Sequence, residues 1–591
     1  MSQFTTLQHI HIPAERPDGT DALFFQPGAD LLTASDPCAF AMPAGGHVCF
    51  NAYANVLDLG GLRQLRKDLR VGMRIEATGR FMLIWRLATD SGPPRTLCTR
   101  EIEAEAGCVL DLACPWIDHA PDGLVHLEVI SLTPCRFREL SFHCIDLQLR
   151  RCHVALVITH FKREQQVRDA LARLRTLTGQ WDDDCTLEIL VIDNSGTLGS
   201  DLNGPGVRIL PNPNLGGSGG FSRGLLECMD QGGVTHCLFM DDDASCTNES
   251  VRRAVQAVRI SESRDVAVAG AMLLEDRPTT LHESGAQFDG LWIPLRHHLR
   301  IDNPAGLLRM ECARQRIDYG GWWFFLFPIA SARTFPFPFF VRGDDVGFGL
   351  TNPFRIVDLM GVCSWQPDFS EKSSPLTVYL DTRGLLVHTL ARTYGNRRAQ
   401  VRKVLRHCVT RFNDGHLYAS AEAALLAAKD VLQGPRFFRE NPHLEARMPL
   451  LQALNRQERF ETASPWAPDA TTQRLGKREH RRRSRILRWT LGGLLLPSAD
   501  TPEQDVPVAY RGSPPGKKDV YRAPFVLYRD RPGTATLRAV RSPWRQFVIR
   551  LKTASLIARY HLRKGALHSD YKLGYSSLAS ETHWRRLLDK L

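Results

Sequence analysis

Short apolar segments alternate with helical patterns through residues 151–400, and this alternation constrains the fold more than any other feature of the chain. The apolar segments are 154–159, 187–193, 207–210, 237–240 and 266–271. Helical patterns at 165–177 and 249–258 separate several of them. Strands that alternate with helices predict a largely parallel, doubly wound α/β sheet. Such sheets bind ligands beyond the carboxyl ends of their strands, so the polar residues at those ends are the candidate functional residues.

The segments on either side of this region have different patterns. Residues 1–150 contain short apolar stretches bounded by Gly, Pro, Asn and Asp, which is typical of a β-sandwich or barrel. Residues 401–591 are basic and helical in pattern, and the clearest helix candidate is 421–432 with Ser420 placed to cap its start. The sequence therefore predicts three domains: β-rich at 1–150, α/β at 151–400 and mainly helical and basic at 401–591.

Charge and cysteine content limit the partners and the compartment. The formal net charge of +11 favours anionic partners: nucleic acid, a membrane surface or phosphorylated substrates. The fifteen cysteines form no C-x-x-C pair, so we expect reduced thiols in a cytosolic protein. No signal peptide is expected at the N-terminus. The longest apolar run, 322–330, is far shorter than the ~20 residues of a transmembrane helix, so any membrane contact is expected to be peripheral.

The strongest local signal is a run of three aspartates at 241–243, directly after an apolar strand. Residues two apart in an extended segment point to the same side, so Asp241 and Asp243 can share one divalent cation while Asp242 points elsewhere. Close carboxylates raise one another's pKa unless a cation neutralises them. Oxygen ligands of this kind suit Mg²⁺ or Mn²⁺ holding a substrate's phosphates. The alternative interpretation is a solvated acidic turn.

Polar segments also follow three neighbouring strands. The segment N-L-G-G-S-G-G-F-S-R, which begins at Asn214, places four glycines before a helical pattern. Glycines allow close backbone approach to a ligand, and a helix start offers free N–H groups to an anion. Two earlier strands end in H-F-K-R at 160–163 and in D-N-S-G at 193–196, whose polar groups could bind a base and a ribose. Plain flexible loops are the alternative for each.

Two later segments combine aromatic and acidic residues. In Y-G-G-W-W-F-F-L-F-P, at 319–328, the paired tryptophans either belong to the core or stack on the C–H faces of sugars. In R-G-D-D, at 342–345, the acidic pair is a reasonable place for a general base. A salt bridge of that pair with Arg342 is the alternative.

Taken in order, these motifs resemble an inverting GT-A glycosyltransferase of the family-2 type. The glycine segment, M-D-D-D, G-G-W-W-F-F, R-G-D-D and the later S-P-W-R-Q-F are similar to the galactan-polymerising galactofuranosyltransferases of the mycobacterial cell wall. The resemblance covers nearly the whole chain. It implies a GT-A, Rossmann-like nucleotide-sugar domain, UDP-galactofuranose as the donor, Mn²⁺ or Mg²⁺ as the cofactor, and a glycan or lipid-linked glycan as the acceptor.

The resemblance also implies roles for residues that match the motifs. Asp345 would be the catalytic base, and Asp344 would hold the acceptor beside it. The implied nucleotide-sugar ligands are Lys162, Arg163, Asp193, Asn214, Gly217 and Asp242. The implied acceptor contacts are Trp322, Trp323, Glu283 and Asp344. The implied metal ligands are Asp241, Asp243 and Gln366.

Gln366 departs from the family, which has a histidine after the tryptophan of this segment. The Gln366 amide oxygen would ligate a metal more weakly than that histidine, or water would replace it. His388 lies in a later, helical stretch, and we do not expect it to substitute. A second departure is Gly384, where the family has asparagine after the arginine. These changes predict an altered metal preference, a different donor or reduced activity.

The function expected from the resemblance is inverting transfer of galactofuranose from UDP-galactofuranose to a hydroxyl of a galactan-like cell-surface acceptor. The alternatives are a glycosyltransferase that uses another nucleotide sugar and a catalytically weak glycan-binding homologue. Nucleic-acid binding is not expected, because the basic run 474–488 lacks interleaved stacking aromatics. That run carries eight Lys and Arg residues, which predicts a cytoplasmic protein held peripherally on the inner face of the cell membrane. A homo-oligomer is compatible with the sequence.

Overall fold

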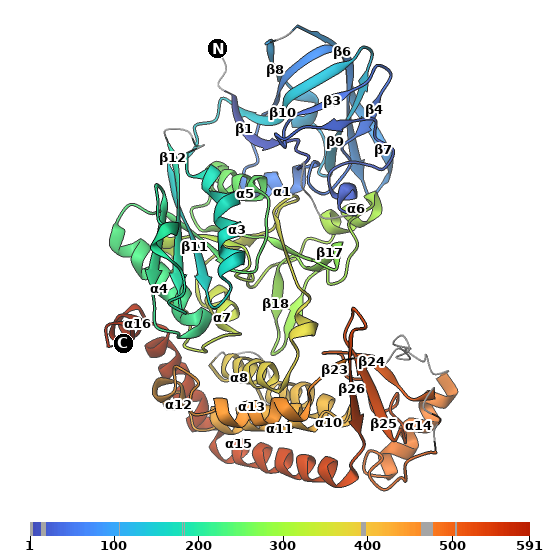
Figure 1. Ribbon diagram of the computed structural model, residues 1–591, viewed down its shortest axis with the longest axis vertical. Coiled ribbons are helices and arrows are strands. Elements are labelled where there is room, and N and C mark those ends of the chain that lie inside the picture. The colour runs from blue at the N-terminus through green and yellow to red at the C-terminus, as the bar shows by residue number, and fades with distance from the viewer. Residues whose placement is uncertain are drawn as a thin grey trace.

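The computed structural model describes residues 4–13, 19–105, 107–179, 181, 184–391, 397–462, 477–500, 502 and 505–590. Along the longest axis of the molecule, the N-terminal strands lie at one end and a layer of C-terminal helices lies at the other (Figure 1). A mixed sheet with its covering helices lies between them and carries the candidate site. The chain is thus a mixed α/β protein, as predicted. The predicted division at residues 150 and 400 stays a prediction.

The N-terminal part is an antiparallel ten-stranded sheet in which β6 pairs with four other strands. Its strands are β1 (Phe4–His9), β2 (Leu32–Thr33), β3 (Phe40–Met42), β4 (His47–Cys49), β5 (Leu57–Asp58), β6 (Val71–Thr89), β7 (Gly92–Ala104), β8 (Val109–Ala113), β9 (Leu124–Ser131) and β10 (Cys135–Ile145). Two short helices, α1 (Leu59–Leu65) and α2 (Pro115–Asp118), complete it.

The central part is built on a seven-stranded sheet in the order β13-β12-β11-β14-β20-β15-β21. Its strands are β11 (Cys152–His160), β12 (Cys185–Asp193), β13 (Val207–Pro211), β14 (His236–Asp241), β15 (Val266–Ala269), β20 (Phe325–Pro328) and β21 (Arg355–Val357). The four strands β13, β12, β11 and β14 pair in parallel with one another. Strand β20 runs antiparallel to both of its neighbours, β14 and β15. Parallel strands covered on both faces are continuous apolar runs, which is why they could be found in the sequence.

Smaller elements surround this sheet. They are the helices α3 (Glu164–Leu174), α4 (Gly216–Gln231), α5 (Asn248–Ile260), α6 (Pro304–Cys312) and α7 (Asp344–Thr351), the sheet of β16 (Ala271–Leu274), β17 (Arg277–Glu283) and β22 (Cys363–Gln366), and the pair β18 (Ala286–Phe288) and β19 (Trp292–Pro294). Strand β22 pairs in parallel with β16, which brings the segment around residue 366 next to the central sheet.

The C-terminal part is mainly helical but also contains a four-stranded sheet. Its helices are α8 (Pro375–Ala391), α9 (Arg397–Leu405), α10 (Arg411–Asp414), α11 (Tyr418–Val431), α12 (Arg436–Glu440), α13 (Met448–Gln457), α14 (Lys477–Trp489), α15 (Pro543–Leu578) and α16 (Glu581–Leu588). Its strands are β23 (Glu461–Thr462), β24 (Val508–Tyr510), β25 (Phe525–Arg529) and β26 (Ala535–Val540). In the part of the chain that the structure describes, no helix combines the length and apolar character needed to cross a bilayer.

The predicted capping of α11 by Ser420 is wrong. The helix begins at Tyr418, and Ser420 lies inside its first turn. The Glu458 carboxylate accepts the backbone N–H groups of Ala419 and Ser420 and the Ser420 hydroxyl. A side chain from beyond the end of α13 therefore satisfies the free N–H groups that a local cap would have taken.

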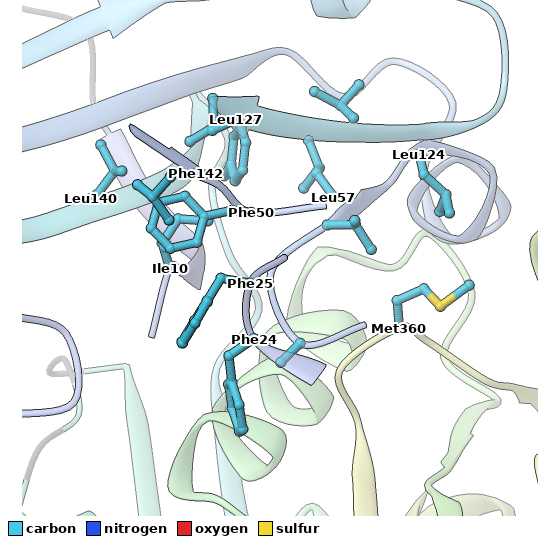
Figure 2. Packing of buried hydrophobic residues seen from close by; sticks show 14 of the residues in the cluster. Ile10, Phe24, Phe25, Phe50, Leu57, Leu124, Leu127, Leu140, Phe142 and Met360 are labelled. Carbon is cyan, nitrogen blue, oxygen red and sulfur yellow. The ribbon is translucent and has the colours of Figure 1, made fainter. Parts of the chain in front are cut away.

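The N-terminal sheet shares one hydrophobic core with the central part. Figure 2 shows Phe24, Phe50 and Leu127 of the N-terminal sheet in the same cluster as Met360, which precedes β22. Ion pairs also join the two parts, for example Asp58 with Arg314. The N-terminal sheet is therefore packed onto the segment that precedes Gln366.

Candidate active site

Three parallel strands end at the same edge of the central sheet, and the predicted polar residues gather there. The β11–β12 register pairs His160 with Asp193, and the β11–β14 register pairs Thr159 with Asp241. The Lys162 N–H donates to the Ser195 hydroxyl oxygen at 3.2 Å, which ties two of the following loops together. The strand ends thus lie side by side, as expected for a sheet of this topology.

Asp241 and Asp243 lie close enough to share one neighbour, Gln366. The Gln366 amide nitrogen is 2.9 Å from Asp243 Oδ1 and 3.5 Å from Asp241 Oδ2. Backbone hydrogen bonds between Ser245 and Trp365 in both directions hold β22 against this turn. Gln366 is almost fully buried, and its Oε1 atom has no hydrogen-bond partner.

The acidic turn carries strong electrostatic strain. Burial and then the charges of Asp243 and Asp242 raise the pKa of Asp241 to about 8. Asp243 is ion-paired with Lys372 at 2.8 Å and with Arg163 at 3.0 Å. The two carboxylates suit a hard divalent cation such as Mg²⁺ or Mn²⁺, and the Gln366 oxygen could join them only after the amide turns over, because its nitrogen now faces them.

Asp242 bonds to the loop after β11, and it lies in the turn after β14 rather than on the strand itself. Its Oδ1 atom accepts a hydrogen bond from Arg163 at 2.6 Å, and its Oδ2 atom accepts the Phe161 N–H at 3.0 Å. Burial opposes its ionisation, but the hydrogen bond from His160 and the charge of Arg163 hold its pKa below the ordinary value. Asp242 therefore anchors the loop after β11, and its contact with a nucleotide sugar stays a prediction.

Other predicted nucleotide ligands also shape their own loops. Asp193 accepts the backbone N–H groups of Ser195, Gly196 and Leu198. Asn214 Oδ1 accepts the Gly216 N–H at 3.1 Å. These bonds fix the loops in place. Whether the same side chains also meet a nucleotide stays a prediction, as it does for the exposed Lys162.

The glycine segment lets the chain approach itself closely. Gly216 has a φ of +66°, and a Cβ placed on it would lie 2.1 Å from the Phe340 carbonyl oxygen. A Cβ on Gly220 would lie 2.3 Å from Thr159 Cγ2. Helix α4 is therefore pressed against β11 and against the turn before α7. Gly217 differs, because it lines a cavity. A Cβ placed on Gly217 would lie 3.5 Å from its nearest neighbour, Asp344 Oδ2, which is an ordinary contact distance.

The acidic pair of R-G-D-D forms the first turn of α7. Asp344 Oδ2 accepts the Ser218 hydroxyl at 2.9 Å, and Asp345 Oδ1 accepts the Val346 N–H at 2.8 Å. Arg342 forms its ion pair with Asp381 of α8 at 3.0 Å. The alternative of an ion pair between Arg342 and the R-G-D-D carboxylates is therefore not what the structure contains.

Burial makes these carboxyl groups weak acids. It raises the pKa of Asp344 to about 6, although hydrogen bonds from Ser218 and the backbone lower it. Burial and the charge of Asp344 raise the pKa of Asp345 to about 7. Burial and the nearby Asp345 raise the pKa of Glu283 well above its ordinary value. A carboxylate with a pKa near neutrality is a suitable general base at physiological pH.

One cavity of about 420 Å³ joins the two acidic sites. Both Asp241 and Asp345 line it. Its other lining residues include Gly217, Phe221, His282, Glu283, Trp292, Tyr319, Trp322, Trp323, Arg342, Asp344, Phe369 and Asp381. The volume is that of a site for a small organic ligand.

The paired tryptophans belong to the core and also border the cavity, while stacking on a sugar stays a prediction. Trp322 packs against Phe221 and Phe239, with ring centroids 4.8 and 5.2 Å apart, and Trp323 donates its indole N–H to the Gly270 carbonyl at 3.0 Å. Both side chains are buried in hydrophobic clusters, yet both border the cavity. Core packing fixes the wall that a sugar would meet.

The sequence did not single out several residues of the site. Lys372, on the 3₁₀ turn Phe369–Lys372, reaches Asp243, and Asp381 reaches Arg342. No local pattern marks a lysine that meets an aspartate 129 positions earlier in the chain. His388 lies on α8, and its Nε2–H donates to the Gly343 carbonyl oxygen at 2.7 Å.

The fold and the site define a mixed α/β protein with an acidic, ligand-sized cavity at the carboxyl ends of its strands. No family model matches the chain. Galactofuranosyltransferase GlfT2 of Mycolicibacterium smegmatis is 24% identical over 372 residues, which are 58% of this chain and 57% of that protein. Galactofuranosyltransferase GlfT2 of Mycobacterium tuberculosis is 28% identical over 265 residues, which are 40% of each chain. The predicted resemblance to galactofuranosyltransferases is thus confirmed, over about half of the length of these relatives.

The solved structures that resemble this chain superpose on it poorly. TarS of S. aureus in complex with UDP-GlcNAc is 13% identical, covers 53% of this chain and 95% of that chain, and has a TM-score of 0.32. The mannosyltransferase PcManGT of Pyrobaculum calidifontis, in complex with GDP-Man and Mn²⁺, is 11% identical, covers 48% and 75%, and has a TM-score of 0.28. Likeness at this level carries no weight for the function of this chain.

Proposed function

We propose that this chain is an inverting GT-A-type glycosyltransferase that moves galactofuranose from UDP-galactofuranose to a hydroxyl of a galactan-like acceptor. The observation that carries the proposal is the single cavity that Asp241 and Asp345 both line. In this proposal, the Asp241 side of the cavity would bind the donor's phosphates, and the Asp345 side would hold the general base. The resemblance to galactofuranosyltransferases supports the choice of donor.

The donor end would be formed by the strand-end loops. Asp241, Asp243 and Gln366 would hold a divalent cation, which supplies charge neutralisation to the departing diphosphate when bound. Arg163 and Lys372 already lie beside Asp243 and add two fixed cations near the same place. When a cation neutralises Asp243, Lys372 would be able to face phosphate oxygens, while Arg163 keeps its ion pair with Asp242.

The acceptor end would be formed by the start of α7. An acceptor hydroxyl has an alcohol-like pKa and is a poor nucleophile until a base removes its proton. Asp345 takes that proton while the hydroxyl oxygen attacks the anomeric carbon, and the bond from that carbon to UDP breaks on the opposite face. One base and no covalent intermediate suffice for this displacement, and the configuration inverts because the attack comes from the face opposite to the departing UDP. A positioned general base contributes typically about 10²- to 10⁴-fold.

Neighbouring groups would keep Asp345 in its role. Asp344 is fixed by the Ser218 hydroxyl and raises the pKa of Asp345 through its charge. Burial and the nearby Asp345 raise the pKa of Glu283 well above its ordinary value, which favours the protonated form that could donate a hydrogen bond to an acceptor oxygen. Trp322 and Trp323 would present apolar surface to the bound sugar.

Product analysis tests the proposal. The purified chain is incubated with UDP-galactofuranose, Mn²⁺ or Mg²⁺ and a short galactofuranosyl acceptor, and the product is examined by mass spectrometry and by NMR of its new anomeric centre. We expect one or more added hexose units with inverted configuration. A panel of other UDP-sugars distinguishes a different donor, and absence of transfer from every donor would favour the catalytically weak homologue that the Gln366 departure allows.

We also propose that the chain works as a peripheral protein on the inner face of the cell membrane. Part of the basic run, 474–476, lies outside the described residues, and the rest falls in α14. Near the end of α14, Trp489 is 85% exposed, and Trp544 on α15 is 71% exposed. Arg550 donates to the Leu491 carbonyl, so the loop after α14 is held against α15. Exposed tryptophans beside arginines suit the headgroup layer of an anionic bilayer.

A further inference from the structure

A second cluster of metal-ligating side chains lies in the N-terminal sheet, outside the sheet that carries the acidic pairs. Cys49 ends β4, and His126 and Glu128 lie on β9. The two strands pair antiparallel with Cys49 opposite Glu128. Alternate residues of a strand face the same side, so all three side chains lie on one face of two adjacent strands. One donor atom from each of them lies within 4.8 Å of the other two.

The histidine of this cluster is buried and incompletely bonded. His126 is 2% exposed, and its Nδ1 atom has no hydrogen-bond partner. Buried polar atoms without partners are rare in folded proteins. Burial lowers the pKa of His126 to about 4, so the ring is neutral at physiological pH and keeps a free lone pair. That is the form of histidine that binds metal ions.

Glu128 is already oriented by a charged neighbour. Its Oε1 atom lies 2.6 Å from Arg86 Nε, and Arg86 stands opposite His126 in the pairing of β6 with β9. Its second carboxylate oxygen would then be the one that binds the metal ion. An outer partner that orients a ligating carboxylate is usual at metal sites. The positive charge of Arg86 opposes a cation here, and the thiolate formed by Cys49 on binding would offset it.

We propose that Cys49, His126 and Glu128 form a Zn²⁺-binding site that links β4 to β9, with water as the fourth ligand. A sulfur, a ring nitrogen and a carboxylate oxygen form a donor set that Zn²⁺ accepts and that Mg²⁺ and Ca²⁺ do not favour. Ligand atoms around a tetrahedral zinc are about 3.5 Å apart. The donor atoms of the three side chains would therefore have to move about 1 Å closer together to complete the site. The site is independent of the proposed glycosyl transfer.

Cobalt is a suitable probe because a Co²⁺–thiolate bond gives a charge-transfer absorption that carboxylate ligands do not give. The full-length chain is stripped of metal, titrated with Co²⁺ and then with Zn²⁺, and the absorption is followed. We expect one equivalent of Co²⁺ to produce the thiolate band and Zn²⁺ to displace it. Burial raises the pKa of the Cys49 thiol to about 11, so each bound ion should also release about one proton at pH 7.

Two variants and a matched control decide the outcome. Cys49→Ser should abolish the band, and Glu128→Gln should keep it but weaken Zn²⁺ affinity at least about tenfold, since a neutral amide replaces an anionic ligand. Cys135→Ser changes another buried cysteine of the same sheet and should bind as the native chain does. A band that is absent from the native chain, or one that survives in Cys49→Ser, would overturn the proposal. If Cys49→Ser does not fold, unchanged affinity in Glu128→Gln would overturn it as well.

Discussion

Replacing Asp345 with asparagine should remove activity and at the same time stabilise the protein at alkaline pH. Asparagine is nearly isosteric with aspartate but cannot accept the acceptor's proton. Turnover should therefore fall by about 10²- to 10⁴-fold, the usual contribution of a general base. Binding of UDP should hardly change, because the strand-end loops that would hold it are untouched.

The expected stabilisation follows from the buried charge. Burial and Asp344 raise the pKa of Asp345 from 3.8 to about 7 in the folded chain. At pH 8 the folded chain must therefore keep an ionised carboxylate in a place that disfavours it, whereas the unfolded chain ionises freely. A difference of about three pKa units corresponds to at most roughly 4 kcal/mol, reduced by the coupling to Asp344. Asp345→Asn removes this penalty, which is present above pH 7 and disappears as the pH falls below 4.

Two assays check this pair of effects. UDP release with donor and acceptor measures turnover, and thermal unfolding at pH 5 and pH 8 measures stability. The control is Asp289→Asn, which changes a surface carboxylate paired with Lys403. Native activity should rise between pH 6 and pH 8 as Asp345 ionises. The reasoning is refuted if Asp345→Asn keeps more than about a tenth of native turnover, or if it is destabilised at pH 8.

Three further predictions concern the metal end and the membrane surface. Asp243→Ala should abolish metal-dependent UDP binding in calorimetry, because one carboxylate is too few to hold the cation; unchanged affinity with the metal still required would contradict the assignment. Gln366→His should strengthen Mn²⁺ binding and shift preference away from Mg²⁺, because imidazole suits transition metals; the same metal profile in the native, Gln366→His and Gln366→Ala proteins would show that Gln366 is no ligand. Replacing both Trp489 and Trp544 with alanine should reduce flotation with anionic liposomes, and added salt should reduce it further; flotation that ignores both changes would exclude this surface.

Local patterns were sufficient to predict five of the seven strands of the central sheet, but not β20 or β21. Asp241 and Asp243 share the neighbour Gln366, as their spacing predicted, but Asp243 lies in the turn after β14, so the two-residue period of a strand is not the reason. The cap of α11 could not be predicted, because Glu458 reaches it from 38 residues away. The same limit applies to Lys372, whose partner Asp243 lies on another element.

The burial of the acidic groups also could not be predicted from the sequence. Glu283, Asp344 and Asp345 become weak acids because β17 and α7 bury them together around one cavity. The glycine segment shows a related limit. Its composition indicated close approach to a ligand, but at Gly216 the backbone that approaches is that of Phe340. Only tertiary structure distinguishes these cases.

The central claim is that one cavity binds a galactofuranose donor at its Asp241 end and activates an acceptor hydroxyl at its Asp345 end. The most direct test is product formation from UDP-galactofuranose and a short galactofuranosyl acceptor. The native chain and Asp345→Asn are compared after a binding measurement has shown that both have the same affinity for UDP. We predict galactofuranosyl transfer with inversion by the native chain and at least a hundredfold less by the variant. Transfer with retained configuration, or equal transfer by both proteins, would contradict the account.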